Sequence, residues 1–156
     1  MKNTFGLIGF PLSHSFSKKY FTDKFNAQGL TGYAYENFEL KQIEDLPALI
    51  RSYPALRGLN VTIPYKEQVI PFLDDLDPYA RKIGAVNVIR IENGKLTGYN
   101  SDYFGFRKSL EDWAGPSLKQ MKALVLGTGG AAKAILTVLE DCNVDYRTVS
   151  RTSGRA

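Results

Sequence analysis

Cysteine is nearly absent from this sequence, which contains only Cys142. A disulfide within the chain and a cysteine-rich metal site are therefore excluded. No apolar run approaches the roughly 20 residues that a membrane-spanning helix requires. The first residues, MKNTFGLIGFPLSHS, contain a short apolar segment but no small-residue cleavage site, so they predict a first strand and not a signal peptide. These features favour a cytoplasmic protein with no membrane partner.

Dense runs of one charge are also lacking. The net charge is +4, yet the lysines and arginines are scattered and no aromatic RNA-binding signature accompanies them. We therefore expect a solvated, mildly basic surface and no nucleic-acid partner. An anionic small substrate or cofactor is compatible with the same charge. A length of 156 residues suits one ordinary domain or two small ones.

The first two thirds of the chain alternate between strand and helix patterns. We expect strands at residues 4–10, 33–40 and 56–64, helices at 13–30 and 41–53, an irregular stretch at 65–84, a hairpin at 85–100 and a helix opening at Asp102. The hairpin turn is expected at Asn93-Gly94, and Gly29 is expected to end the first helix. The apolar positions at helical spacing are Phe16, Tyr20, Phe21, Phe25, Ile43, Leu46, Leu49 and Ile50. This alternation predicts an α/β fold with a mainly parallel sheet.

A second unit is expected after a turn-rich loop, AGPSLKQM, near residue 120. The strand KALVLG leads into Gly127-Thr128-Gly129-Gly130, and a helix then opens at Ala131. Glycines let a backbone approach a dinucleotide pyrophosphate, and the helix N-terminus offers free N–H groups. The pattern is G-x-G-G-A and not the full G-x-G-x-x-G, but it has the strand and the helix that such a loop requires. A tight strand-helix turn without a ligand is the alternative.

The end of the next strand indicates which dinucleotide would bind. NAD enzymes place an acidic residue here, whereas this chain has Ser150, Arg151, Thr152 and Arg155. A carboxylate would repel a 2′-phosphate, and an arginine can form paired hydrogen bonds with it. We therefore predict NADP; the alternative is that both arginines are merely exposed.

Polar side chains gather where strands end, which is where open α/β sheets bind ligands. Asn60 and Thr62 are two residues apart on one strand and Lys66 follows Pro64. Taken alone, Lys66 would be a solvated lysine. Similar groups are Ser13, His14, Ser15 and Ser17 after the first strand, Asn87 in GAVNV, and Asp102 at a helix start. Each has a structural alternative, namely helix capping or backbone pairing. His14, the only histidine, is a possible base, but we expect it to shape the first loop.

These segments together resemble the shikimate dehydrogenase family. The motifs GFPLSHSFS, LNVTIPYKE, GAVNV, GYNSDYFGF, LGTGGAAKA and SRTSGRA occur in the family's order and spacing and extend over essentially the whole chain. The resemblance implies reversible, NADPH-dependent reduction of 3-dehydroshikimate to shikimate in aromatic amino acid (chorismate) biosynthesis. It also implies a substrate domain at 1–102, a connector at 103–120 and a Rossmann-type NADP-binding domain at 121–156.

The resemblance assigns roles residue by residue. Ser15 and Ser17 match the serines that bind the substrate carboxylate, and Asn60, Thr62, Lys66, Asn87 and Asp102 match the hydroxyl-binding and catalytic residues. Lys66 and Asp102 would relay the proton. The cofactor-binding set would be Gly127, Thr128, Gly129, Gly130, Ala131, Ser150, Arg151, Thr152 and Arg155. No metal site is implied.

Three departures from the family pattern are visible. Ser150 stands where the family usually has Asn, and Lys18 where Pro often follows the second serine. The family's chains also continue well past residue 156, so we expect an N-terminal fragment with an incomplete cofactor domain and little activity alone. A quinate/shikimate dehydrogenase and a non-catalytic shikimate-binding fragment remain alternatives, and the protein is expected to be a monomer or homodimer.

Overall fold

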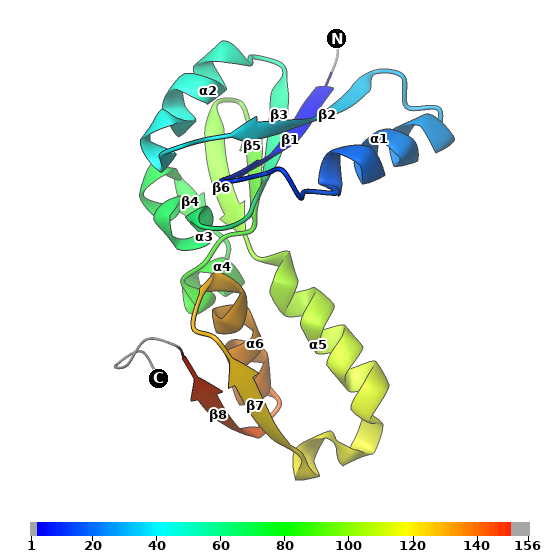
Figure 1. The fold of residues 1–156 in the computed structure, drawn as a ribbon, viewed down its shortest axis with the longest axis vertical. Helices are drawn as coiled ribbons and strands as arrows, with labels where there is room; N and C mark the ends of the chain where they lie inside the picture. The colour runs from blue at the N-terminus through cyan, green and yellow to red at the C-terminus, as the bar shows by residue number, and fades with distance from the viewer. Residues whose placement is uncertain (1–2, 151–156) are drawn as a thin grey trace. The chain divides into compact units, whose positions relative to one another are not determined.

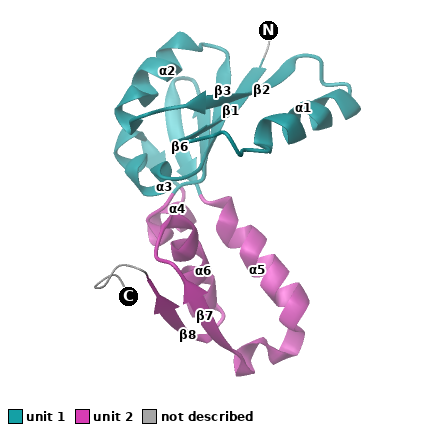
Figure 2. Ribbon diagram, viewed as in Figure 1, with its two compact units in different colours: residues 1–76, 86–99 teal, residues 77–85, 100–156 magenta. Residues whose placement is uncertain are grey.

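A computed structural model describes residues 3–150 of the chain (Figure 1). The chain forms two compact units, shown in separate colours in Figure 2. The first unit comprises Met1–Leu76 and Val86–Tyr99, and the second comprises Asp77–Ala85 and Asn100–Ala156. Within residues 3–150, no helix has both the length and the apolar character that a membrane crossing needs.

The first unit is built on a six-stranded sheet. Its elements are β1 (Asn3–Gly9), α1 (Ser17–Ala27), β2 (Tyr33–Glu39), η1 (Ile43–Asp45), α2 (Leu46–Ser52), β3 (Leu56–Val61), α3 (Tyr65–Gln68), η2 (Ile70–Phe72), β4 (Asp75–Leu76), β5 (Val88–Glu92) and β6 (Lys95–Tyr99). The strand order is β2-β1-β3-β5-β6-β4. The β1–β2, β1–β3 and β4–β6 pairs are parallel, and the β3–β5 and β5–β6 pairs are antiparallel. The predicted α/β fold with a mainly parallel sheet is confirmed.

The alternation of side chains along β2 assigns helices to the two faces of the sheet. Tyr35 stacks on Phe21 of α1, with ring centroids 4.5 Å apart. Phe38 contacts Tyr53, which follows α2, with centroids 4.9 Å apart. Because odd and even residues of a strand point to opposite faces, α1 and the end of α2 lie on opposite sides of β2.

The hairpin prediction is confirmed by the backbone. β5 and β6 pair antiparallel from Val88↔Tyr99 to Glu92↔Lys95. Asn93 and Gly94 both have positive φ, at 52° and 79°. Two such residues in sequence form the turn that matches the twist of the flanking strands.

Two expectations for the first unit need correction. The helix expected at 41–53 is a 3₁₀ turn, η1, followed by the separate helix α2. Pro47 lies in the first turn of α2, because proline has no N–H to donate and is tolerated there and not in a helix interior. Of the apolar residues at helical spacing in the first predicted helix, Phe16 and Tyr20 are exposed by 83% and 60%.

The stretch expected to be irregular contains α3, η2, β4 and α4 (Pro78–Ile83). The local chemistry of α4 explains why it forms. The Asp77 carboxylate accepts a hydrogen bond from the Ala80 N–H at 2.7 Å, Pro78 occupies the first turn, and Gly84 ends the helix at φ 68°. Each of these is a known helix signal.

The second unit contains a β-α-β arrangement. Its elements after α4 are α5 (Ser101–Ala114), η3 (Gly115–Gln120), β7 (Lys122–Leu126), α6 (Gly130–Asp141) and β8 (Asp145–Val149). β7 and β8 pair in parallel. One core cluster joins Ala114 and Leu118 to Val125 and Leu139. The segment expected to be a connector at 103–120 therefore contributes to the core of this unit. A compact unit of the fold need not coincide with a functional domain. The predicted boundaries of the substrate-binding and cofactor-binding domains, at residues 102 and 120, therefore stay predictions.

A polar network ties α4 and α5 to the end of α6. The Asp141 carboxylate accepts hydrogen bonds from Lys82 Nζ at 2.5 Å and from the Tyr103 hydroxyl at 2.8 Å. Arg107 donates to the Tyr103 hydroxyl at 3.0 Å. The hydrogen bond from Lys82 is the largest cause of the lowered pKa of Asp141. Tyr103 is fully buried, so this network satisfies its hydroxyl inside the unit.

We expect β7 and β8 of the 156-residue chain to exchange amide hydrogens faster than β1 and β3. Each of β1 and β3 is paired on both edges, whereas the described residues pair β7 with β8 alone. Leu124 and Leu126 are also exposed by 63% and 77%, so one face of β7 is open to water. Hydrogen exchange read by mass spectrometry measures this. Equal protection in both sheets would contradict the expectation.

Candidate functional site

The carboxyl ends of β1 and β3 meet at one edge of the first unit's sheet. These strands are parallel, and hydrogen bonds continue beyond their ends: the Thr62 N–H donates to Ile8 at 2.9 Å, and the Phe10 N–H donates to Ile63 at 3.0 Å. A side chain at Gly9 would collide with Thr62 Cγ2, so glycine is needed for this close approach. The loops that follow the two strands therefore start side by side.

Asn87 and Lys66 are held at the same edge by backbone hydrogen bonds. The Asn87 carbonyl accepts from the Val61 N–H at 2.9 Å, and the Lys66 carbonyl accepts from the Val86 N–H at 2.7 Å. Asn87 is buried and Lys66, in the short helix α3, is half-buried. The structure thus gathers the predicted residues Asn60, Thr62, Lys66 and Asn87 around the ends of three neighbouring strands.

The serine loop reaches this edge through Tyr35. The Tyr35 hydroxyl donates to Asn60 Oδ1 at 2.7 Å. Burial raises the pKa of Tyr35 to about 12, and a hydrogen bond from Ser17 opposes that rise. Ser15 lies in the same loop, and its Oγ accepts from the Ser17 N–H at 3.3 Å. The loop is therefore attached to Asn60 by way of one buried tyrosine, while His14 lies exposed in the turn after β1.

Asp102 belongs to the second unit and lies in the first turn of α5. The helix was expected to open at Asp102, but its N-cap is Asn100, whose Oδ1 accepts from the Tyr103 N–H at 3.3 Å. The Asn100 amide also donates to the Ala85 carbonyl at 2.9 Å, and Asn100 is only 1% exposed. A buried residue that caps a helix and binds a second segment determines where that helix begins.

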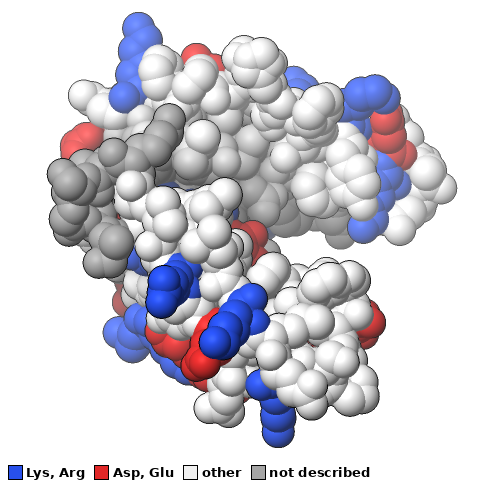
Figure 3. Space-filling view, turned by 60° about the horizontal axis from the view of Figure 1, so that its bottom comes forward, with Lys and Arg blue, Asp and Glu red and all other residues white. Residues whose placement is uncertain are grey.

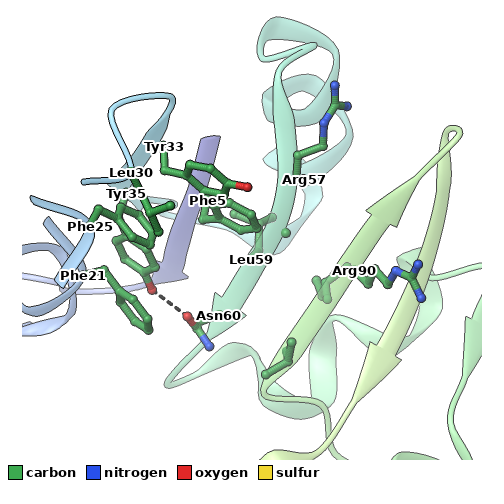
Figure 4. A pocket seen from close by; sticks show the side chains of 13 residues that line it. Phe5, Phe21, Phe25, Leu30, Tyr33, Tyr35, Arg57, Leu59, Asn60 and Arg90 are labelled. Carbon is green, nitrogen blue, oxygen red and sulfur yellow. Dashed lines mark hydrogen bonds between the residues drawn. The ribbon is translucent and has the colours of Figure 1, made fainter. Parts of the chain in front are cut away.

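A cavity of about 340 Å³ lies beside α1 and not at the polar edge (Figure 4). Its lining is almost entirely apolar and includes the rings of Phe5, Phe21, Phe25 and Tyr33. Such a lining offers few hydrogen bonds to a molecule rich in hydroxyl groups. The cavity includes only Asn60 of the predicted site, so it does not mark the place for a polar ligand.

The glycine loop of the second unit fits a phosphate group. Gly127 has φ 114°, a backbone conformation that favours glycine. A side chain added at Gly129 would meet no atom of residues 3–150 within 4 Å, and its backbone is extended, so packing within these residues gives no reason for glycine there. A ligand approaching the backbone does give a reason. The loop leads directly into the N-terminus of α6, a helix of 12 residues.

The same loop is attached to the end of β8. The Gly127 N–H donates to the Val149 carbonyl at 2.8 Å, which places Ser150 next to the glycine loop. Thr128, Gly130 and Ala131 belong to the loop and the first turn of α6. The remaining predicted cofactor residues, Arg151, Thr152 and Arg155, lie outside the described residues.

Surface charge is interspersed on the face shown in Figure 3. Lysine and arginine side chains occur there singly or beside acidic ones. Examples of such pairs in the described chain are Lys108–Asp112 at 2.9 Å and Arg107–Glu111 at 2.8 Å. Among residues 3–150, no three His, Cys, Asp or Glu side chains are grouped as metal ligands.

The fold and the two sites define the class of protein. A mixed α/β unit with a polar strand edge is followed by a β-α-β unit of Rossmann type. The chain belongs to the shikimate dehydrogenase family, because the family model described as the shikimate dehydrogenase substrate binding domain matches residues 7–89, more than half of the chain.

Individual relatives agree with this membership. The chain is 42% identical over 137 residues to the NADP(+) shikimate dehydrogenase of Aquifex aeolicus, covering 86% of this chain and 50% of that protein. It is 47% identical over 139 residues to that of Clostridium beijerinckii, covering 88% of this chain and 50% of the relative. The chain spans about half the length of the curated relatives it matches.

Solved structures show the same fold. The crystal structure of shikimate dehydrogenase 1 from Peptoclostridium difficile matches with a TM-score of 0.87 at 39% identity, covering 99% of this chain and 59% of that one. Shikimate 5-dehydrogenase from Thermus thermophilus, solved in complex with NADP(H) and shikimate, matches with a TM-score of 0.84 at 34% identity, covering 99% and 58%.

Sequence reasoning missed two residues of these sites, Tyr35 and Asn100. Asn100 had a local signal, since asparagine is a preferred N-cap and stands directly before a helical pattern. Tyr35 had none, because it lies in the middle of a strand and is 25 residues from its partner Asn60.

Proposed function

We propose that this chain carries the substrate-binding and cofactor-binding segments of an NADP-dependent shikimate dehydrogenase. The reaction would be the reversible reduction of 3-dehydroshikimate to shikimate. The single observation that carries the proposal is the clustering of Asn60, Thr62, Lys66 and Asn87 at one sheet edge, with Ser17 joined to it through Tyr35. Side-chain amides and hydroxyls of this kind suit a ring that carries several hydroxyl groups and a carboxylate.

The proposed chemistry assigns a proton to Lys66. As the substrate carbonyl is reduced, its oxygen gains negative charge and requires a proton, which the Lys66 ammonium donates; in the reverse direction the amine accepts it. Asp102, by the family resemblance, would hold the lysine or the hydroxyl in line. Ser15 and Ser17 would bind the carboxylate and so orient the ring.

The cofactor assignment is supported by the glycine loop and by the arginines that follow β8. Gly127, Gly129, Gly130 and the N-terminus of α6 would hold the pyrophosphate, and Arg151 and Arg155 would hold the 2′-phosphate. NADPH, when bound, supplies the hydride. The residues of the chain bind, orient and exchange the proton.

Shikimate titration combined with an NADP turnover assay tests the proposal. We expect saturable shikimate binding, and NADP reduction in a form of the protein that completes the cofactor site. The measurement can use this chain or a longer polypeptide that contains it. Absence of both shikimate binding and turnover in every form would overturn the proposed function.

Arg151→Ala should weaken NADP binding by about 10- to 100-fold and leave NAD binding almost unchanged. The physical reason is the loss of charge-assisted hydrogen bonds to the 2′-phosphate, which NAD lacks. Titration of both dinucleotides measures the effect. Arg147→Ala, at an exposed position of β8, is the matched control. Equal losses for NADP and NAD would mean that Arg151 supports the fold and not the phosphate.

A further inference from the structure

Tyr35 is buried in β2 and contacts the polar edge of the sheet through Asn60. It is 3% exposed, and its ring stacks on Phe21 with an interplanar angle of 14°. β1 lies between β2 and β3, and Leu7 of β1 is the register partner of Asn60. The Tyr35 side chain therefore extends across β1 to reach Asn60 on β3.

The contact of Tyr35 with Asn60 has a direction. A tyrosine hydroxyl has one hydrogen to donate, and Tyr35 donates it to Asn60 Oδ1 at 2.7 Å. Ser17 also interacts with the Tyr35 hydroxyl, and this interaction lowers the pKa of Tyr35 against the rise that burial causes. The hydrogen bond between Tyr35 and Asn60 therefore runs from the phenol to the amide oxygen.

Because the amide oxygen of Asn60 accepts from Tyr35, its amide nitrogen is left for another partner. Figure 4 shows the Asn60 oxygen facing Tyr35 and the nitrogen on the opposite side of the group. An asparagine amide has one accepting end and one donating end, and rotating it by 180° would replace the oxygen that accepts from Tyr35 with the NH₂ group and so break the observed hydrogen bond. The hydroxyl of Tyr35 thus selects one of the two orientations of the amide.

We propose that Tyr35 is a positioning residue that holds the Asn60 amide so that its NH₂ group faces the substrate. Asn60 then acts as a hydrogen-bond donor, and the ligand atom opposite it must be an oxygen that accepts. The inference rests on the proposed function, because it takes the sheet edge to be the shikimate site. It extends that proposal by stating that Asn60 donates a hydrogen bond to the ligand.

Two substitutions test separately the role of the Tyr35 hydroxyl and the need for a hydrogen-bond donor at Asn60. Tyr35→Phe removes only the hydroxyl and keeps the ring on Phe21. We expect shikimate to bind about tenfold more weakly, the worth of one neutral hydrogen bond, with KM rising more than kcat falls. Asn60→Asp keeps an acceptor for Tyr35 but has no donor for the substrate. We expect a loss of binding on the order of a hundredfold, with an unchanged fold by circular dichroism.

Tyr33→Phe is the matched control, since it makes the same change two residues away on the same strand, at a ring that is 39% exposed and stacked on Phe5. It should bind shikimate as the parent does. Parental binding by Tyr35→Phe, or by Asn60→Asp, would overturn the inference.

Nuclear magnetic resonance of the Asn60 side-chain NH₂ group keeps this test separate from the proposed function. The two amide hydrogens should give distinct, sharp signals in the parent protein and move selectively in Tyr35→Phe. If the parent protein binds no shikimate, the proposed function is overturned. The positioning role of Tyr35 toward the substrate is then overturned too, even if the Asn60 signals change in Tyr35→Phe. If the parent binds shikimate but the Asn60 signals do not change in Tyr35→Phe, only the role of Tyr35 is overturned.

Discussion

Lys66→Ala should lower the turnover of shikimate by a factor on the order of 10² to 10⁴, the range expected for the loss of an acid/base group. Shikimate affinity should change much less, because the hydroxyl-binding amides and hydroxyls of the site remain. The Lys66 backbone is held independently of its side chain by the hydrogen bond from the Val86 N–H at 2.7 Å. Steady-state kinetics together with a shikimate titration separates the two effects.

A charge-preserving variant distinguishes proton transfer from electrostatics. Lys66→Arg keeps the positive charge, but a guanidinium does not release its proton near neutral pH. We therefore expect turnover to stay low in this variant. Lys19→Ala, which removes a side chain that is 80% exposed, is the control and should behave as the parent. Turnover within a few-fold of the parent for Lys66→Ala would show that Lys66 is not the proton relay.

Asn100→Ala should destabilise the second unit by about 2–4 kcal/mol. The substitution removes the cap of α5 and leaves the Tyr103 N–H and the Ala85 carbonyl without their partners at 3.3 and 2.9 Å. Asn100 is 1% exposed, so water cannot readily replace these bonds. Hydrogen exchange of the α5 amides, with urea unfolding of the whole chain, measures the loss.

Asn100→Ser is the matched variant for this prediction. Serine is also a good N-cap, so it should restore the acceptor for the Tyr103 N–H while it lacks the donor for Ala85. We expect its destabilisation to lie between those of the parent and of Asn100→Ala. Unchanged exchange of the α5 amides in Asn100→Ala would mean that tertiary packing alone sets the start of the helix.

The start of α5 shows how far the local sequence could predict a helix boundary. Asn100 and Asp102 are both good N-cap residues before one helical pattern, and only the observed bond to the Tyr103 N–H separates them. The α4 helix carried complete local signals in Asp77, Pro78 and Gly84, so the prediction of an irregular stretch there overlooked signals that the sequence contained. Pro47 likewise marked the division between η1 and α2.

Long-range contacts were the part that local patterns could not supply. Nothing near Tyr35 in the sequence indicates Asn60, which lies two strands away in the sheet. The burial of α4 and α5 against α6 was equally hidden, because helical periodicity shows which face is apolar but not which element covers it. The exposed rings of Phe16 and Tyr20 show the same limit, since their spacing matched that of the half-buried Phe21 and Phe25.

By itself the sequence determined the order of the longer strands and helices, the Asn93-Gly94 turn, the glycine loop before α6 and membership of the shikimate dehydrogenase family. These features depend on residues that are close together in the chain, where periodicity and backbone preferences act directly. The tertiary structure decided the gathering of Asn60, Lys66 and Asn87 at one edge, and the orientation of Asn60 by Tyr35. These depend on strand order and on hydrogen bonds between distant residues, which exist only once the sheet has formed.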